Sequence, residues 1–240
     1  MTTPTAADAH AHARQATLAA FRSRRATKAF DPARTIPDDD VDFLFEIARL
    51  SPTSHGLEPF RILVLADRQL RADLVAKAGG VAAQMVDASH LLAITANTAA
   101  AIRPDSVQNR HVKVEVQGLP ESEFGTWCER FGDFLSTRYG AWGNERAMFD
   151  WAARQAYIVL GNLMTAGAMI GIDSCALEGM VYAEADAILA DAGAIDPATE
   201  RLAVMVALGY RLGEPHRPAI RRPLADVVRT IGSAHSGHRS

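Results

Sequence analysis

The sequence predicts one layered domain of the α/β or α+β class. Short apolar runs of strand length alternate with longer stretches that have the periodicity of helices. The chain has 240 residues, of which 48% are hydrophobic and 22% charged, so it can bury one large core. Neither a fixed-period repeat nor a linker rich in proline, glycine and serine divides it. These observations favour a single domain.

The first expected elements are two helices. Residues 1–20 are rich in alanine and polar side chains, which predicts a helix with a frayed start. A second helix is expected over Asp38–Leu50, because Pro37 and three aspartates mark its start and apolar residues recur with helical spacing. Two prolines and a glycine in Ser51–Pro59 end this helix in a loop.

Strands and helices alternate along the rest of the chain. The predicted strands are Phe60–Ala66, His90–Asn97 and Leu202–Tyr210, and the predicted helices are Arg68–Lys77, Glu121–Arg138, Ala147–Ile170 and Ala183–Asp191. The apolar stretch Ala156–Ile172 has 17 residues and three glycines, and it is short for a membrane span. Its small residues indicate either a central core helix or a helix at a subunit interface.

Composition and missing motifs exclude several classes of protein. The net charge of −3 provides no broad positive field for nucleic acid. Cys128 and Cys175 lie too far apart in sequence for a metal knuckle or a redox pair, and the scattered histidines predict no metal site. The motifs of classical Rossmann sites, P-loop NTPases, zincins and α/β-hydrolases are absent. No signal-peptide pattern opens the chain, so we expect a cytoplasmic protein without a membrane partner.

Two segments of this acidic chain are locally basic. Phe21–Arg34 contains five basic residues against one acid, and Arg211–Arg229 contains five against two. Such clusters suit a phosphate or carboxylate ligand, because the guanidinium fork donates two parallel hydrogen bonds. Charge alone favours the other interpretation, which is that both segments are solvated surface faces.

Five segments share a pattern with known proteins. They are SRRATKAFDP (23–32), ARLSPTSHGLEPFRILV (48–64), MVDASHLLAI (85–94), WAARQAYIVLGNLMTAGAMIGIDSCALEG (151–179), and the pair AVMVALGY (203–210) and RRPLADVV (221–228). Together they resemble the flavin-dependent nitroreductase family in order and spacing, from about residue 15 to about residue 230.

The resemblance implies a fold and a division of the chain. The expected subunit is an α+β, three-layer structure with a central mixed sheet flanked by helices, in a homodimer of the domain-swapped type. Residues 1–14 become a flexible N-terminal extension, residues 15–230 the FMN-binding domain, and residues 231–240 a disordered tail.

The resemblance also implies an FMN site at each side of the dimer interface. Arg24 matches a phosphate ligand, Arg25 a ligand of the phosphate–ribityl region, Lys28 a contact to the pyrimidine edge, and Arg221 a second phosphate ligand. A loop reaching FMN from the other subunit is matched by Pro52, Thr53, Ser54 and Gly56, and the turn over the ring by Leu177, Glu178 and Gly179. The dianionic FMN phosphate accounts for two basic segments in an acidic protein.

Three residues are predicted to be catalytic, namely Lys28, Glu178 and Gly179. The resemblance implies that hydride would pass from NADH or NADPH to flavin N5, near backbone N–H groups of the turn, and that Lys28 would stabilise the negative charge that develops near N1. No side chain is nominated as a proton donor.

Some positions depart from the family pattern. Ala26 stands where a hydroxyl residue often caps the phosphate, Gly56 where asparagine is common, and Ala219 where a basic residue can help. Gln84 is assigned to the pyrimidine edge or, alternatively, to the solvated surface. The segment that covers the substrate channel contains aromatic residues that could stack on the acceptor or form core, namely Phe124, Phe131 and Phe134.

The expected function is that of an FMN-dependent NAD(P)H oxidoreductase, which reduces a small-molecule electron acceptor of nitroaromatic or quinone-like type by a ping-pong mechanism. Three alternatives remain open: a specialised flavoenzyme of the same fold, of dehalogenase or flavin-cleaving type; a flavin-binding carrier or sensor without turnover; and an anion-binding structural dimer.

Overall fold

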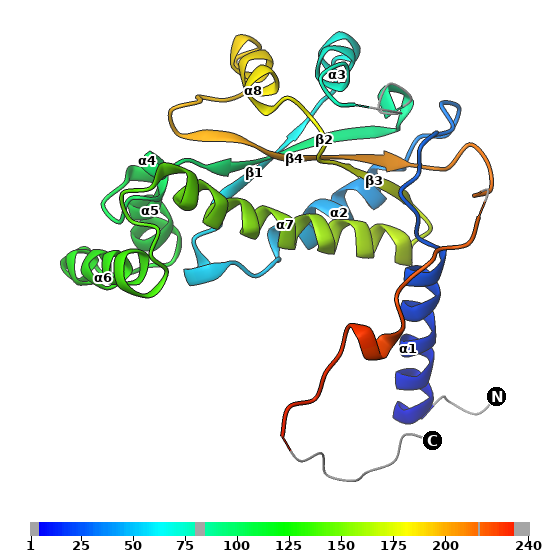
Figure 1. Ribbon diagram of the computed structural model, residues 1–240, viewed down its shortest axis with the longest axis horizontal. Coiled ribbons are helices and arrows are strands. Elements are labelled where there is room, and N and C mark those ends of the chain that lie inside the picture. Colours follow the sequence, from blue (N-terminus) through cyan, green and yellow to red (C-terminus); the bar gives the residue numbers. More distant parts are fainter. Residues whose placement is uncertain (1–4, 80–84, 216, 233–240) are drawn as a thin grey trace.

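A computed structural model describes residues 5–79, 85–215 and 217–232. Its centre is a four-stranded sheet in the order β1-β2-β4-β3, as Figure 1 shows. The strands are β1 (Phe60–Val64), β2 (His90–Asn97), β3 (Asp173–Leu177) and β4 (Glu200–Gly209). The predicted strand His90–Asn97 has the bounds of β2, and the predicted strand Leu202–Tyr210 overlaps β4.

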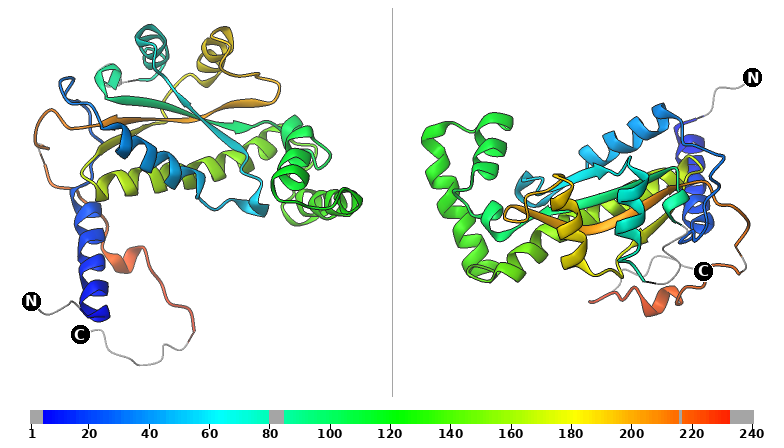
Figure 2. Two further views of the ribbon diagram at one scale, coloured as in Figure 1. Left: turned by 180° about the vertical axis from the view of Figure 1, so that it is seen from behind. Right: turned by 90° about the horizontal axis from the view of Figure 1, so that it is seen from above.

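Helices cover both faces of this sheet and complete the expected three layers (Figures 1 and 2). One face is covered by α2 (Asp38–Arg49) and α7 (Glu145–Met169), and the other by α3 (Arg68–Val75) and α8 (Tyr182–Asp191). Each face has its own hydrophobic core. Along β2, Leu92 and Ile94 belong to the core beneath α7, while Leu91 and Ala93 belong to the other. Because successive side chains point into one core and then the other, nearly every residue of β2 and β4 is buried, and both strands are unbroken apolar runs in the sequence.

The sheet corrects one part of the predicted fold, because its strands are not mixed in direction. All three strand pairs are antiparallel. The parallel pairing is a single bridge between Ala26 and Ser174, where the Thr27 N–H donates to the Ser174 carbonyl at 3.1 Å. One residue pair is too short to make a strand, so this contact does not extend the sheet. Strand β3 was also absent from the predicted strands.

Helix α1 (Ala6–Ser23) projects away from the sheet layers (Figure 1). Thr5 and Asp8 form a capping box at its start, and Ala20 is its buried residue. Residues 6–14 of the predicted extension are therefore helical, while residues 1–4 lie outside the described part of the chain. Of the predicted tail, residues 233–240 also lie outside it. The domain boundaries at 14 and 230 stay predictions.

A helical excursion lies at the end of the subunit opposite α1 (Figure 2). It comprises α4 (Ala99–Ile102), α5 (Val107–Arg110), a π-helical segment (His111–Val116), α6 (Glu121–Asp133) and a second π-helical segment (Phe134–Arg138). The last two together account for the predicted helix Glu121–Arg138. Within the described ranges, every helix is too short or too polar to span a lipid bilayer.

Candidate functional site

The first basic segment continues from α1 along the edge of strand β3. Arg24 caps the C-terminus of α1, with its N–H donating to the Ala20 carbonyl at 3.0 Å. The following residues run beside β3 through the bridge between Ala26 and Ser174. Ala26 is itself exposed. The helix end and the strand edge therefore fix the backbone of the predicted phosphate-binding segment.

Lys28 reaches the same strand with its side chain. Its Nζ lies 3.5 Å from Sγ of Cys175, which is buried. Burial raises the pKa of the Cys175 thiol, and the nearby positive charges of Lys28 and Arg24 oppose that shift. Within the part of the chain that the structure describes, neither Arg24 nor Lys28 forms an ion pair. Two uncompensated positive charges thus lie close together at β3.

Arg25 is engaged differently from Arg24 and Lys28. Its Nη1 donates to the carbonyls of Arg22, Ser23 and Arg24 at 2.6, 3.2 and 2.9 Å. These bonds satisfy acceptors at the C-terminal end of α1. The Arg25 Nε is buried and has no partner within the described residues. Its assignment to the phosphate–ribityl region stays a prediction.

Other basic residues have structural partners. Arg211 forms a bidentate ion pair with Asp173 at the start of β3, and its Nη2–Oδ1 distance is 2.5 Å. The Asp173 carboxylate holds the pKa of Arg211 above its ordinary value. Arg34 stacks over the ring of Tyr210, with its Cζ 3.7 Å from the ring centroid. Among the residues that the structure describes, Arg24 and Lys28 are thus the cations at β3 without a carboxylate partner.

Arg221 lies on the C-terminal arm, just before the short 3₁₀ helix Leu224–Asp226. The side chain is exposed, and its Nη1 donates to the Ile220 carbonyl at 2.8 Å. The C-terminal arm runs from β4 past the C-terminal end of α1 (Figure 1), which Arg24 caps. The assignment of Arg221 as a second phosphate ligand stays a prediction.

The turn after β3 is held by hydrogen bonds from two other parts of the chain. The hydroxyl of Tyr157 on α7 donates to Oε1 of Glu178 at 2.9 Å, and the Gly79 N–H donates to the Gly179 carbonyl at 2.9 Å. Leu177, just before the turn, is buried. Burial and the contact with Glu178 raise the pKa of Tyr157 well above its ordinary value, so its hydroxyl remains a donor. Glu178 borders two cavities of about 590 and about 880 Å³.

The loop that contains Pro52, Thr53, Ser54 and Gly56 lies on another side of α7. The Ser54 N–H donates to Oε1 of the buried Gln155 at 2.9 Å. The Thr53 hydroxyl accepts from the Glu58 N–H at 3.0 Å, which closes the loop on itself. Pro52 is exposed. The loop is therefore held by α7, but not against the basic segment.

An aromatic cluster adjoins this loop. Phe131 is 1% exposed and belongs to the core, whereas Phe124 and Phe134 are partly exposed. The ring of His55 meets Phe131 and Phe134 edge-on, at centroid distances of 5.0 and 4.5 Å. Phe131 thus has the core role that the sequence left open, and Phe124 and Phe134 remain the better candidates for acceptor contacts.

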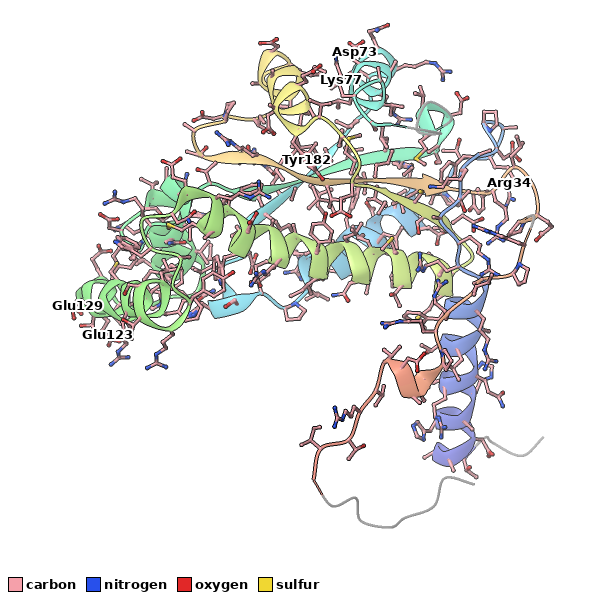
Figure 3. The ribbon with its side chains drawn as sticks, in the orientation of Figure 1. Arg34, Asp73, Lys77, Glu123, Glu129 and Tyr182 are labelled. Atoms are coloured by element: carbon pink, nitrogen blue, oxygen red, sulfur yellow. The ribbon has the colours of Figure 1, made fainter. Side chains whose placement is uncertain are left out.

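The predicted site residues form two groups within one subunit. Arg24, Lys28 and the Glu178–Gly179 turn gather around β3, while the loop and the aromatic cluster lie towards the helical excursion. In Figure 3, Arg34 marks the end that carries the basic segment, and Glu123 and Glu129 mark α6 at the opposite end. Gln84 lies outside the described residues.

Comparisons with known proteins decide the family. The sequence profile described as the nitroreductase family matches residues 21–210. The chain belongs to the nitroreductase family. A Bacillus subtilis relative that carries the provisional name NAD(P)H nitroreductase YfkO is 38% identical over 215 residues, which cover 89% of this chain and 96% of the relative.

Solved structures of nitroreductases share the fold. The Bacillus subtilis nitroreductase ydfN has a TM-score of 0.72 at 21% identity, covering 92% of this chain and all of that one. A nitroreductase from Exiguobacterium sibiricum, solved in complex with FMN, has a TM-score of 0.66 at 19% identity, covering 95% of this chain and all of that one. At these identities the likeness establishes the nitroreductase fold alone.

Sequence reasoning missed several residues that hold the nitroreductase site elements in place. Gln155 and Tyr157 lie in the predicted helix Ala147–Ile170, at and just inside the start of its apolar stretch, and their polar groups were the available signal. Cys175 was excluded from metal and redox roles, and its approach to Lys28 depends on the fold. Lys113 and Gln117, which contact the loop, carried no sequence signal.

Proposed function

We propose that this nitroreductase is an FMN-dependent NAD(P)H oxidoreductase acting on nitroaromatic or quinone-like acceptors. The observation that carries the proposal is a pair of cations, Arg24 and Lys28, that form no ion pair with any described residue and lie near the Glu178–Gly179 turn at the end of β3. A cytoplasmic location stays a prediction from the sequence.

The donor set in this region fits FMN. Arg24 provides a guanidinium for the dianionic phosphate, and Lys28 provides an ammonium on the same extended segment for the polar edge of the ring. The space beside Gly179 is open, since a Cβ built there would meet no atom within 4 Å, and this turn is the part of the protein that would lie over the flavin ring. When bound, FMN supplies the hydride-transfer chemistry. The protein residues bind it, orient it and place positive charge beside it.

A homodimer would complete this site. The loop with Thr53 and Ser54 does not reach the basic segment of its own subunit, so a partner's loop is needed if the loop contacts FMN. Large apolar side chains are exposed on α1 and along the C-terminal arm, which indicates surface that a partner could cover. They include Leu18, Phe21, Ile220, Leu224 and Ile231, with exposed fractions of 51–80%.

The first experiment is a visible spectrum of the purified protein with identification of the released flavin, together with light scattering at micromolar concentration. We expect bound FMN and a dimer. A preparation that stays colourless after incubation with FMN would refute the proposal, and a flavin-loaded monomer would refute the shared site.

Steady-state kinetics with a quinone separate an oxidoreductase from a flavin carrier. We expect sustained NAD(P)H consumption and parallel initial-rate lines at several quinone concentrations, because donor and acceptor would use one site in turn. Intersecting lines would mean that both substrates bind together. No consumption by an FMN-loaded dimer would favour a carrier, or a specialised flavoenzyme that nicotinamide does not reduce efficiently.

A further inference from the structure

The loop between α2 and β1 has a backbone conformation that needs external support. His55 and Gly56 both lie in the left-handed region, with φ values of 57° and 60°, and Glu58 follows at 46°. A residue with a Cβ loses about 1–2 kcal/mol in this region. Two of these three residues carry a Cβ, so the isolated loop would favour other conformations.

Two side chains from the π-helical segment and its end hold this loop. The Lys113 Nζ donates to the His55 carbonyl at 2.6 Å, and the Gln117 Nε2 donates to the Gly56 carbonyl at 2.5 Å. Lys113 also donates to Oε1 of Gln117 at 2.7 Å, which fixes the amide orientation. Each carbonyl of the left-handed pair thus has its own donor. We call Lys113 and Gln117 the loop clamp.

Lys113 is unusual in its surroundings. The residue is 9% exposed, and its hydrogen-bond acceptors are a carbonyl and an amide. Within the described residues it forms no ion pair, and burial lowers the pKa of its ammonium group. Its Nζ lies 5.4 Å from the centroid of the Trp127 ring. A buried ammonium without a carboxylate is unfavourable for stability. The benefit that the structure shows for keeping Lys113 in this place is its charge-assisted hydrogen bond to the loop.

Gly56 fits this clamp better than a residue with a side chain. A Cβ at this position would lie 3.1 Å from the Gln117 Nε2, and the positive φ would add strain. The glycine that departs from the family pattern therefore allows Gln117 to reach the backbone.

We propose that Lys113 and Gln117 are positioning residues that hold the loop in the shape in which it contacts FMN on the partner subunit. This inference rests on the proposed function for its ligand. The clamp itself can be observed in the protein without flavin.

The sharpest test replaces Gln117 by glutamate. Gln117→Glu keeps an acceptor for Lys113 but places a second acceptor against the Gly56 carbonyl, so it breaks one bond of the clamp and retains the other. Glu115→Gln is the matched control, because Glu115 is on the same π-helical segment and pairs with Arg110 and His111 at the surface. Gln117→Leu serves as a second variant that removes the amide without adding charge.

Two measurements are made on each variant. Hydrogen–deuterium exchange of residues 52–58 in the flavin-free protein reports the loop directly, and we expect it to accelerate about tenfold in Gln117→Glu, as for the loss of one stabilising bond. FMN titration should give a dissociation constant about tenfold higher, and the visible circular dichroism of bound FMN should change. The dimer should stay as in wild type in both Gln117 variants, and Glu115→Gln should match wild type throughout.

Unchanged exchange in both Gln117 variants would overturn the clamp. Faster exchange with unchanged FMN affinity and dichroism would overturn the positioning role towards FMN. If wild-type protein bound no FMN at all, the proposed function would fail, and the role towards FMN with it. The exchange of the flavin-free protein would still decide whether the clamp holds the loop.

Discussion

Replacing Asp173 by asparagine should destabilise the protein and loosen the basic segment. Asp173 accepts hydrogen bonds from the Arg211 backbone N–H, from Nε and from Nη2, at distances between 2.5 and 3.0 Å. Arg211 in turn donates from Nη2 to the Ser23 carbonyl at 3.4 Å. The pair therefore ties together the start of β3, the end of β4 and the end of α1.

The magnitude follows from the burial of the pair. The side chains of Asp173 and Arg211 are 11% and 24% exposed. Removing one partner of a fully buried pair destabilises by about 3–5 kcal/mol. Because Arg211 reaches water and asparagine still accepts one bond, we expect about 2–3 kcal/mol. For a chain of 240 residues with an unfolding entropy of about 0.5 kcal/mol per kelvin, this lowers the melting temperature by about 4–6 °C.

The assay is denaturant unfolding of flavin-free Asp173→Asn and wild type at one protein concentration, since dimerisation makes stability depend on concentration. Asp105→Asn is the control, because the Arg103–Asp105 pair is 60% and 69% exposed and should contribute less than about 0.5 kcal/mol. FMN affinity should also fall in Asp173→Asn. A loss of stability no larger than the control's would refute the structural role assigned to this pair.

Three further predictions concern single side chains. Lys28→Met should keep most of the FMN but slow its reduction by NAD(P)H about tenfold to a hundredfold, because a positive charge beside the ring is lost; a stopped-flow rate equal to wild type at saturating donor would contradict this role. Arg221→Ala should weaken FMN binding about tenfold to a hundredfold in a fluorescence titration, and an unchanged affinity would move the second phosphate ligand to Arg222 or Arg217. Burial and the charge of Arg71 lower the pKa of His90 below its ordinary 6.5, so the folded protein disfavours the protonated form. The free energy of unfolding should therefore decrease as pH falls below about 6.5, and His90→Gln should reduce that decrease in urea titrations at pH 7.5 and 5.

The sequence predicted elements best where both the pattern and the burial are local. Helix α2 begins at the expected Asp38 and ends one residue before the expected Leu50. The prediction is this close because the charged start and the apolar spacing that define the helix lie within the helix itself. Strand β2 matches its prediction because both of its faces are buried and its apolar run is unbroken. Strand β3 begins with Asp173 and Ser174, which are polar, and both are buried only through pairing and contacts with distant residues. That information lies outside any local window of sequence.

The sequence indicated which basic residues could belong to the candidate site, but it could not say which of them bind a ligand and which have a structural partner. A guanidinium that binds a phosphate and one that caps its own helix look the same in a sequence. The structure separates them, since Arg25 donates to three carbonyls at the C-terminal end of α1 and its cap, and Arg211 pairs with Asp173. The role of Gly56 could not be predicted from the sequence either, because its positive φ and the close approach of Gln117 depend on the tertiary structure.

Helix α7 gives a physical reason for expecting a site built from two subunits. Gln155 holds the loop through the Ser54 N–H, and Tyr157 holds the turn through Glu178. Residues two positions apart point about 200° apart around an α-helix, so the loop and the turn are held on nearly opposite sides of α7. Parts fixed on opposite sides of one rigid helix cannot close on the same small ligand within a subunit. If both contact FMN, each FMN must take its turn from one subunit and its loop from a second copy of the chain.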